Sequence, residues 1–320
     1  RIHTSGKQQL NEEAIEILKS IGALLALGSF TANAQQDPQF TQYMYNTVNI
    51  NPAYAGSRGS LSIFGLHRTQ WAGLEGAPQT NAFSVNTPLG DSKLGLGVGF
   101  INDGLGIMDE NTVSVDLSYT IDLNSRGSKF SFGIKGSGNM LNVAYSKLLT
   151  YNPNDPNFQN DISGQFTPNI GAGIYWHNEK SYLGLSIPNF LETTRYDDNI
   201  QSTMRTTMSY YLIGGHVFEL NPMLKFKPAF LVKATNGAPL QADITANFLI
   251  SNRFTLGGAY RWDAAWSALA GFQVTDGLFI GYSYDGETTK LANYNNGSHE
   301  VFLRFELFNK YRRMNTSRFF

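Results

Sequence analysis

Polar and apolar residues alternate along most of this chain with a period of two. From Thr112 to Asp122 the apolar residues stand at the odd positions and the polar residues at the even positions. Successive side chains of a β-strand point to opposite faces, so this pattern predicts strands with one apolar face and one polar face. Fourteen such segments lie between residues 60 and 308. Together they predict an all-β fold, a transmembrane antiparallel β-barrel of about 14 strands with an apolar exterior and a polar lumen.

Most of the predicted strands approach the roughly 9–11 residues that a tilted strand needs to cross a bilayer. Their predicted ranges are 60–71, 80–88, 93–102, 111–122, 129–141, 168–176, 180–187, 206–218, 224–233, 241–249, 253–262, 265–274, 278–285 and 298–308. In the third strand the predicted outward row holds Leu94, Leu96, Val98 and Phe100, and the inward row holds Gly95, Gly97 and Gly99. In the last strand the predicted outward residues are Val301, Leu303, Phe305 and Leu307, and the inward ones are Glu300, Arg304 and Glu306.

The connections between these strands alternate in length. Those after even-numbered strands are tight, whereas those after odd-numbered strands are mostly long, notably 142–167, 188–205 and 286–297, with Asp263-Ala264 as a short exception. Bacterial outer-membrane barrels have short periplasmic turns and longer extracellular loops. The pattern therefore predicts that both termini are periplasmic. A soluble two-sheet sandwich is the alternative, but it would not separate loop lengths by face.

Composition and charge agree with a membrane barrel and argue against other classes. Of 320 residues, 42% are hydrophobic and only 15% are charged, below the roughly 25% of a typical soluble domain. Mean hydropathy is only -0.24, because alternation averages the two faces. A net charge of -1 argues against a nucleic-acid partner. The chain has no cysteine, which excludes disulfides, thiol nucleophiles and thiolate metal sites.

The N-terminal region predicts export. An apolar run over residues 21–30 follows Lys19 and precedes Ala32-Asn33-Ala34, the small-x-small pattern of a signal-peptidase site, which predicts cleavage between Ala34 and Gln35. Residues 1–18 form an atypical acidic extension of this signal peptide (1–34); an amphipathic N-terminal helix is the alternative. The remainder (35–320) is predicted to be a single domain, with an irregular periplasmic segment (35–59), the barrel (60–308) and a tail (309–320).

The segment from Asn51 to Gly56 is predicted to form an ordered turn. Pro52 restricts the backbone, Gly56 permits a left-handed conformation, and Tyr54 supplies an amphipathic ring. The turn is expected to plug the periplasmic mouth or to bind a periplasmic partner. The alternative is that it only packs against the rim of the barrel.

Other candidate partner-binding residues lie near the predicted outer rim. Arg68 and Trp71 come at the end of the first strand. Arg68 is expected to bind either a carboxylate of a partner or a lumenal Asp or Glu of this chain. Loops on a rigid scaffold often carry function, so the long connection around residues 151–161 is predicted to hold a secreted partner through Asn154, Asp155 and Phe158. It lacks the glycine and the bidentate glutamate of a calcium-binding loop, and a plain polar turn is the alternative.

No catalytic site is apparent. After the predicted signal peptide the histidines are His67, His177, His216 and His299, and none has a Ser and Asp set nearby in the sequence. A hydrolase would need a nucleophile, a base and a group that orients the base. The chain is therefore predicted not to be an enzyme and to need no cofactor.

Several short motifs point to one family. They are Asp-Pro-Gln-Phe-Thr-Gln-Tyr-Met at 37–44, Asn-Ile-Asn-Pro-Ala-Tyr-Ala-Gly-Ser at 49–57, Arg-Thr-Gln-Trp-Ala-Gly at 68–73, Gly-Ala-Pro-Gln-Thr at 76–80 and Ser-His-Glu at 298–300. The final Thr-Ser-Arg-Phe-Phe is similar to a Ser-Pro-Arg-Tyr-Phe ending but lacks its Pro and Tyr. From about residue 35 onward the chain resembles the PorP/SprF family of the Bacteroidetes type IX secretion and gliding machinery.

The resemblance implies a location, a function and partners. It implies an integral outer-membrane barrel that assists the export or surface attachment of large adhesins or enzymes bearing a C-terminal sorting domain. The implied partners are such secreted proteins, other type IX envelope components and outer-membrane lipid. A passive porin or small-molecule transporter is the alternative function, because a polar lumen would serve it equally.

Overall fold

The computed structural model describes residues 40–90, 92–124, 127–148, 160–195 and 204–307. Strands make up most of this part of the chain. They are β1 (Leu61–Thr69), β2 (Gln79–Pro88), β3 (Leu94–Leu105), β4 (Met108–Asp122), β5 (Lys129–Val143), β6 (Ile162–His177), β7 (Ser181–Ile187), β8 (Thr193–Arg195), β9 (Met204–Thr206), β10 (Ser209–His216), β11 (Phe218–Asn221), β12 (Leu224–Thr235), β13 (Gln241–Ile250), β14 (Phe254–Arg261), β15 (Ala265–Gln273), β16 (Leu278–Glu287) and β17 (Ser298–Leu307). The helical elements are short turns: η1 (Tyr43–Tyr45), α2 (Thr47–Ile50), η2 (Pro52–Tyr54), η3 (Tyr145–Lys147) and η5 (Lys290–Asn293).

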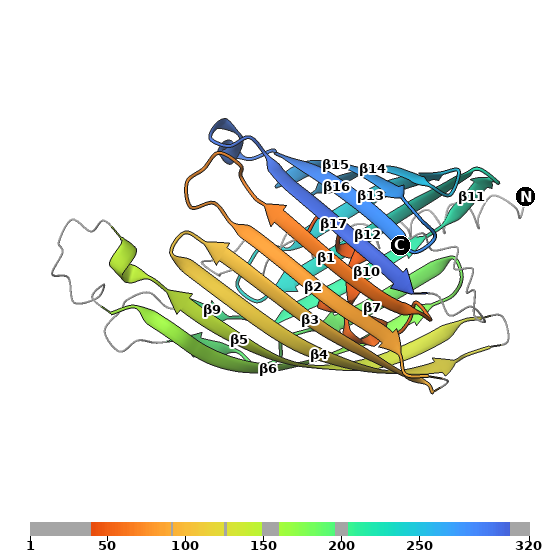
Figure 1. Cartoon of the computed structure of the whole chain (residues 1–320), viewed down its shortest axis with the longest axis horizontal. Coiled ribbons are helices and arrows are strands. Elements are labelled where there is room, and N and C mark those ends of the chain that lie inside the picture. The colour runs from red at the N-terminus through yellow and green to blue at the C-terminus, as the bar shows by residue number, and fades with distance from the viewer. Residues whose placement is uncertain (1–39, 91, 125–126, 149–159, 196–203, 308–320) are drawn as a thin grey trace, which may run out of the picture.

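The strands form one closed antiparallel barrel (Figure 1). Each strand pairs with its neighbours in sequence, β1 pairs with β17, and β10 pairs with β12 to complete the circle. β11 continues β10 after an interruption at Val217 and pairs with the start of β12. The described residues therefore contain fourteen barrel strands, and β8 and β9 form a separate small hairpin between β7 and β10. The predicted strand number and antiparallel order are confirmed.

The main differences from the predicted strands lie at their ends. β4, β5 and β6 are longer than expected, with 15, 15 and 16 residues. As a result β3 and β4 meet through a tight turn at Gly106 and Ile107, where the prediction left residues 103–110 as a connection. Gly106 takes a positive φ of 59°, which a glycine adopts easily and which allows this turn. The short hairpins are therefore not confined to one end of the barrel.

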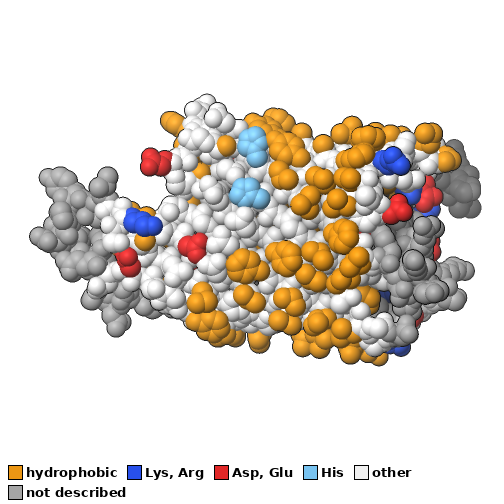
Figure 2. Space-filling model, viewed as in Figure 1, with side chains coloured by type: hydrophobic (Ala, Val, Ile, Leu, Met, Phe, Trp, Pro, Cys, Tyr) orange, Lys and Arg blue, Asp and Glu red, His pale blue; other side chains and the backbone are white. Residues whose placement is uncertain are grey.

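The barrel exterior is apolar, as the alternation predicted. Val98 and Phe100 on β3, and Leu303 and Phe305 on β17, all point outward. Figure 2 shows hydrophobic side chains covering much of one outer face. Large aromatic residues, typical of the interfacial girdle of a membrane barrel, are exposed near the end where β14 finishes and β15 begins: Tyr260, Trp262 and Trp266. Within the described residues, no helix is long and apolar enough to cross a membrane.

The two ends of the barrel differ in their connections. One end, the turn end, carries the connections over 89–93, 178–180 and 222–223, and the opposite loop end carries those over 144–161, 188–208 and 288–297. The start of β1 and the end of β17 pair through Leu61 and Leu307, and both lie at the turn end. Residues 1–39 and 308–320 lie outside the described part of the chain, so the periplasmic placement of the termini stays a prediction.

Candidate functional site

Residues 40–59, which we call the plug, lie inside the barrel. Most side chains of this segment are buried, and Asn51 and Ala53 are 0% exposed. η2 packs against the inner faces of β4, β5 and β6. The sequence predicted an irregular periplasmic segment over 35–59, with a turn that either plugs the mouth of the barrel, binds a partner or packs against the rim. In the structure, residues 40–59 lie in the lumen. The segment's Tyr43, Met44, Tyr45 and Val48 bury apolar surface against the wall, which favours the lumen over water.

Glycines on the inner wall make room for the plug. A Cβ atom at Gly95 would overlap the carbonyl of Ala55, and one at Gly133 would overlap the backbone of Ala53. A Cβ at Gly173 would overlap the Asn51 side chain. Gly95, Gly133 and Gly173 thus leave room on β3, β5 and β6 for the plug, which is the common use of glycine where another part of the chain approaches closely.

Hydrogen bonds fix the plug in this position. Asn51 Nδ2 donates to the carbonyl of Ile174 on β6 at 3.0 Å, and Asn51 Oδ1 accepts from the Ala53 amide at 3.0 Å, which starts η2. On either side, Ser186 donates to the Ile50 carbonyl and Ser118 donates to the Ala55 carbonyl, both at 2.7 Å. These bonds pair polar groups that would otherwise be costly to bury.

The predicted partner-binding residues of this segment therefore lie in the lumen and contact the inner wall. Asn51 and Pro52 are buried in η2 and its cap, and Tyr54 packs edge-on against Tyr175 with ring centroids 5.4 Å apart. Gly56 has a φ of 71° and lies against Gly95 and Pro88 at the turn end. In the structure these residues contact the inner wall of this chain, and a role in binding a periplasmic partner stays a prediction.

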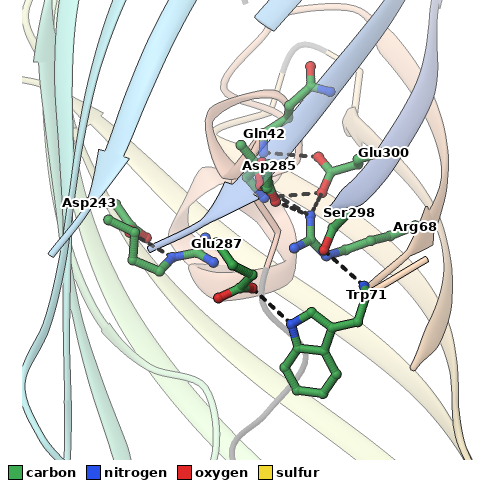
Figure 3. A network of polar contacts seen from close by, with 10 residues as sticks. Gln42, Arg68, Trp71, Asp243, Asp285, Glu287, Ser298 and Glu300 are labelled. Carbon is green, nitrogen blue, oxygen red and sulfur yellow. Dashed lines mark hydrogen bonds and ion pairs between the residues drawn. The ribbon is translucent and has the colours of Figure 1, made fainter. Parts of the chain in front are cut away.

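A buried ionic cluster holds the start of the plug near the loop end (Figure 3). Arg68 Nη1 lies 2.8 Å from Asp285 Oδ2 and 3.1 Å from Glu300 Oε2. Glu300 also accepts the backbone amides of Thr41 and Gln42 at 3.1 and 3.0 Å. Arg68, Asp285 and Glu300 are nearly fully buried. Of the two partners expected for Arg68, the structure shows lumenal carboxylates of this chain.

A second cluster holds the end of the plug near the turn end. Arg58 pairs with Glu306 of β17, and Arg304 lies 3.8 Å from the same carboxylate. The Arg304 guanidinium also stacks over the ring of Tyr45, 5.6 Å from its centroid. Both clusters use residues of β17, so the plug runs along the lumen from the loop end to the turn end and is tied to the barrel at each end.

Trp71 lies at the loop end, just after β1. Its backbone has a positive φ of 50°, which is uncommon for a bulky residue and is held by tertiary contacts. The Trp71 amide donates to Ser298 Oγ at 3.1 Å, and its indole Nε1 donates to Glu287 Oε1 at 2.8 Å. The residue thus joins the β1–β2 connection to β16 and β17. It stays a candidate partner contact because it is only partly buried.

The remaining predicted residues cannot be placed. Asn154, Asp155 and Phe158 of the candidate loop, and Ala34 and Gln35 of the predicted cleavage site, lie outside the described residues. The described ends of that loop are joined, because Asp161 accepts hydrogen bonds from the amide and the hydroxyl of Ser146, both at 2.8 Å. These two bonds hold the pKa of the exposed Asp161 carboxyl below its usual value.

Two cavities flank the plug. One, of about 150 Å³, lies on its loop side and is lined by Phe40, Asn49 and Ile50 of the plug together with residues of β3–β6 and β10. The other, of about 240 Å³, lies at the turn end and is lined by Gly56, Lys93, Lys129, His177 and their neighbours. The plug residues between them are buried. In the described part of the chain, no three His, Asp or Glu residues are grouped so that they could hold a metal ion.

The sequence pattern does not indicate that Asp285 and Glu300 hold the plug. Asp285 stands out in no motif, and Glu300 is marked only by the inward row of the last strand and by the Ser-His-Glu motif. One signal was available: Gly95, Gly97 and Gly99 occupy consecutive inward positions, and such a row indicates that another part of the chain lies close to the wall. The row does not by itself say which segment lies there.

The fold and its exterior define an outer-membrane β-barrel protein. The family model for "Type IX secretion system membrane protein PorP/SprF" matches residues 32–305. The chain therefore belongs to the PorP/SprF family, as its motifs indicated, and is an integral outer-membrane protein.

Comparisons with curated proteins and with solved structures add only distant similarities. No curated protein matches this sequence significantly. Among solved structures, the Acinetobacter baumannii outer membrane protein Omp33 aligns with a TM-score of 0.46 at 6% identity, over 78% of this chain and 98% of that one. The Ralstonia pickettii toluene transporter TbuX aligns with a TM-score of 0.47 at 10% identity, over 87% and 95%. These similarities are too distant to carry an argument about function.

Proposed function

We propose that this barrel is a component of the type IX secretion or gliding machinery that assists the export or surface attachment of large proteins with a C-terminal sorting domain. The observation that carries this proposal is the family match, which extends over residues 32–305 and so includes both the plug and the barrel. The protein acts through binding and not as an enzyme. Its partners are the exported protein and other envelope components of the same system.

The proposal gives the two ends of the barrel different roles. The loop end faces the cell exterior and contacts the exported protein, because it carries the long connections over 144–161 and 188–208. The turn end faces the periplasm and its machinery. In this arrangement Asn154, Asp155 and Phe158 are the loop residues proposed to hold the partner, and Trp71 lies at the same end of the barrel.

A passive porin or small-molecule transporter is the alternative, and the filled lumen argues against it. Asn51, Ala53 and Ala55 are at most 1% exposed between the two cavities. Two ionic clusters and the glycine surface tie this segment to the wall. A passive channel needs a continuous water path, whereas a binding protein does not.

Replacement of the three loop residues tests the proposal. In native cells, Asn154→Ala, Asp155→Ala and Phe158→Ala together are expected to release the secreted partner into the medium while the barrel still assembles. Cell-surface labelling and immunoblotting of the medium measure this release. Unchanged surface retention of every protein with a C-terminal sorting domain would contradict the role of this loop.

A matched variant at the opposite end controls for general damage. Ser92→Ala changes an exposed residue of the short turn between β2 and β3, where no exported partner is proposed to bind. It is expected to retain the partner at the surface. Release by both variants would indicate a general assembly defect and would count against a specific loop contact.

A further inference from the structure

The cavity at the turn end, which we call the turn-side cavity, is bounded by the plug and by the inner wall. The end of the plug lines it through Ala55, Gly56, Ser57 and Gly59. The wall lines it through the turn between β2 and β3 and through the parts of β3, β4, β5 and β6 that lie at this end. At about 240 Å³ the cavity has room for a side chain of a ligand.

The wall brings several charged or titratable side chains to this cavity. Asp122 and Lys129 are directly opposite each other on β4 and β5, and Lys129 is directly opposite His177 on β6. Lys93 immediately precedes β3, and its carbonyl accepts the Thr120 amide at 2.8 Å, which holds this residue beside the end of β4. All of these residues line the cavity.

Positive charge exceeds negative charge in the lining. Among the described residues that line the cavity, Asp122 is the only carboxylate, whereas Lys93 and Lys129 are both cationic. Lys129 Nζ lies 3.7 Å from Asp122 Oδ1, and the Asp122 side chain is 65% exposed, so this pair is a weak one. Lys93 forms no ion pair with any described residue. The lining therefore favours an anionic group.

The neighbouring ionic cluster adds charge of the same sign. Arg58 stands between two residues that line the cavity, and Arg58 and Arg304 share the single carboxylate of Glu306. Arg304 is nearly buried, and its Nη1 atom has no hydrogen-bond partner within the described structure. Buried charges are screened less than exposed ones, so this cluster also attracts an anion to the turn end.

We propose that the turn-side cavity binds the carboxylate of an Asp or Glu side chain presented by a periplasmic partner protein. The carboxylate lies between Lys93 and Lys129, and the partner then contacts the plug at Gly56 and Ser57 as well as the wall. A lipid headgroup is disfavoured, because the cavity lies on the inner face of the wall and lipid meets the outer face. The periplasmic source rests on the proposed function, whereas the preference for a carboxylate rests on the cavity alone.

Two small probes that differ in charge test the cavity. Nα-acetyl-glutamate amide and its neutral analogue Nα-acetyl-glutamine amide are titrated into the purified protein in non-ionic detergent micelles and followed by calorimetry. The glutamate probe is expected to bind with a dissociation constant of about 1 mM or tighter. The glutamine probe is expected to bind at least about tenfold more weakly, because charge-assisted hydrogen bonds are the stronger ones. Inorganic phosphate is expected to bind more weakly than the glutamate probe, because a small ion fills less of the cavity.

Charge variants locate the binding. Lys93→Gln and Lys129→Gln each remove a cation from the lining and are expected to weaken binding of the glutamate probe about tenfold. Asp122→Asn removes the competing carboxylate and is expected to strengthen binding about threefold or more. A gain of this kind cannot arise from a damaged barrel. Heat-modified gel mobility verifies that each variant is folded.

Lys225→Gln is the matched control. Lys225 lies near the start of β12, at the same end of the barrel, but it does not line the cavity. This variant is expected to bind the glutamate probe as the unaltered protein does. The same loss in Lys225→Gln as in Lys93→Gln would show that general attraction to the turn end, and not the cavity, governs binding, which would overturn the proposal.

Other results would overturn the proposal as well. They are equal binding of the glutamate and glutamine probes, no binding of either, or weaker binding by Asp122→Asn. Phosphate that binds at least as tightly as the glutamate probe would indicate a general anion site, and displacement of the probe by micellar phosphatidylglycerol would indicate a lipid site. None of these results depends on partners in the cell. The proposed function fails separately, if no secreted protein or envelope component associates with the barrel.

Discussion

Gly133 on β5 lies so close to Ala53 of the plug that even a methyl group at Gly133 would overlap the Ala53 backbone nitrogen. The plug and the inner wall are therefore shaped for each other, and the plug packs as part of the barrel interior. Gly95 and Gly173 make the same kind of approach on β3 and β6. Because three strands share this surface, the position of the plug depends on the whole barrel wall and not on one contact.

Gly133→Ala is expected to displace the plug or strain the wall. Overpacking a well-packed interior costs about 1–3 kcal/mol, and here the obstacle is backbone, which cannot move like a flexible side chain. The temperature at which the barrel loses its folded gel mobility should fall. Gly136→Ala on the same strand is the matched control, because nothing lies within 4 Å of a Cβ at that position. An equal effect of both substitutions would contradict the account of the glycine surface.

Arg68→Met is expected to destabilise the protein strongly. It leaves Asp285 and Glu300 buried without their cation, and breaking a buried ion pair on one side costs about 3–5 kcal/mol. Urea unfolding in micelles, followed by tryptophan fluorescence, measures the loss. Adding Glu300→Gln to Arg68→Met should recover part of it, since one uncompensated charge is then removed.

An exposed ion pair supplies the control for Arg68. Lys180 and Glu219 lie 3.5 Å apart with both side chains nearly half exposed. Lys180→Met should change the free energy of unfolding by less than about 1 kcal/mol, as is usual for surface pairs. If Arg68→Met costs no more than Lys180→Met, the cluster around Arg68 does not hold the plug.

The hydrogen bonds between Ser146 and Asp161 are expected to break at acidic pH. Hydrogen bonds from Ser146 lower the pKa of the Asp161 carboxyl in the folded protein. The stabilisation is therefore present above the unfolded pKa and is lost as the pH falls through the lowered folded value. The protection factor of the Ser146 amide, which compares its exchange with the intrinsic rate at the same pH, should fall in that acid range. Asp161→Asn should remove this pH dependence, and a profile unchanged by the substitution would exclude Asp161 as its cause.

The filled lumen predicts low conductance. In planar bilayers the unaltered protein should show little steady current, because the plug separates the loop-side cavity from the turn-side cavity. A barrel in which Gly133→Ala loosens the plug should conduct more often or more strongly than one with Gly136→Ala. Large steady currents from the unaltered protein would favour the porin alternative.

Much of the barrel could be predicted from the sequence because its cause is local. Alternation fixes which side of each strand meets lipid, as for Val98 and Leu303, and each strand can be recognised without its neighbours. The interruption at Val217 and the extension of β3 and β4 toward Gly106 could not be predicted in the same way. They depend on pairing with adjacent strands and not on the alternation itself.

The plug is harder to predict because its contacts are distant in sequence. Arg68 meets Glu300 across 232 positions, and Thr41 meets the same carboxylate across 259. No periodicity within residues 40–59 reports such contacts. The family motifs did mark this segment as distinctive, but they could not distinguish a buried role from a partner-binding one.

Isolation from native membranes shows whether this barrel works with the type IX system. The tagged protein is extracted gently from its own outer membrane, and the proteins that accompany it are identified by mass spectrometry. We expect to recover a large protein with a C-terminal sorting domain or an envelope component of the type IX system. Recovery of the barrel alone, by a protocol that preserves other outer-membrane complexes of the same cells, would contradict the claim.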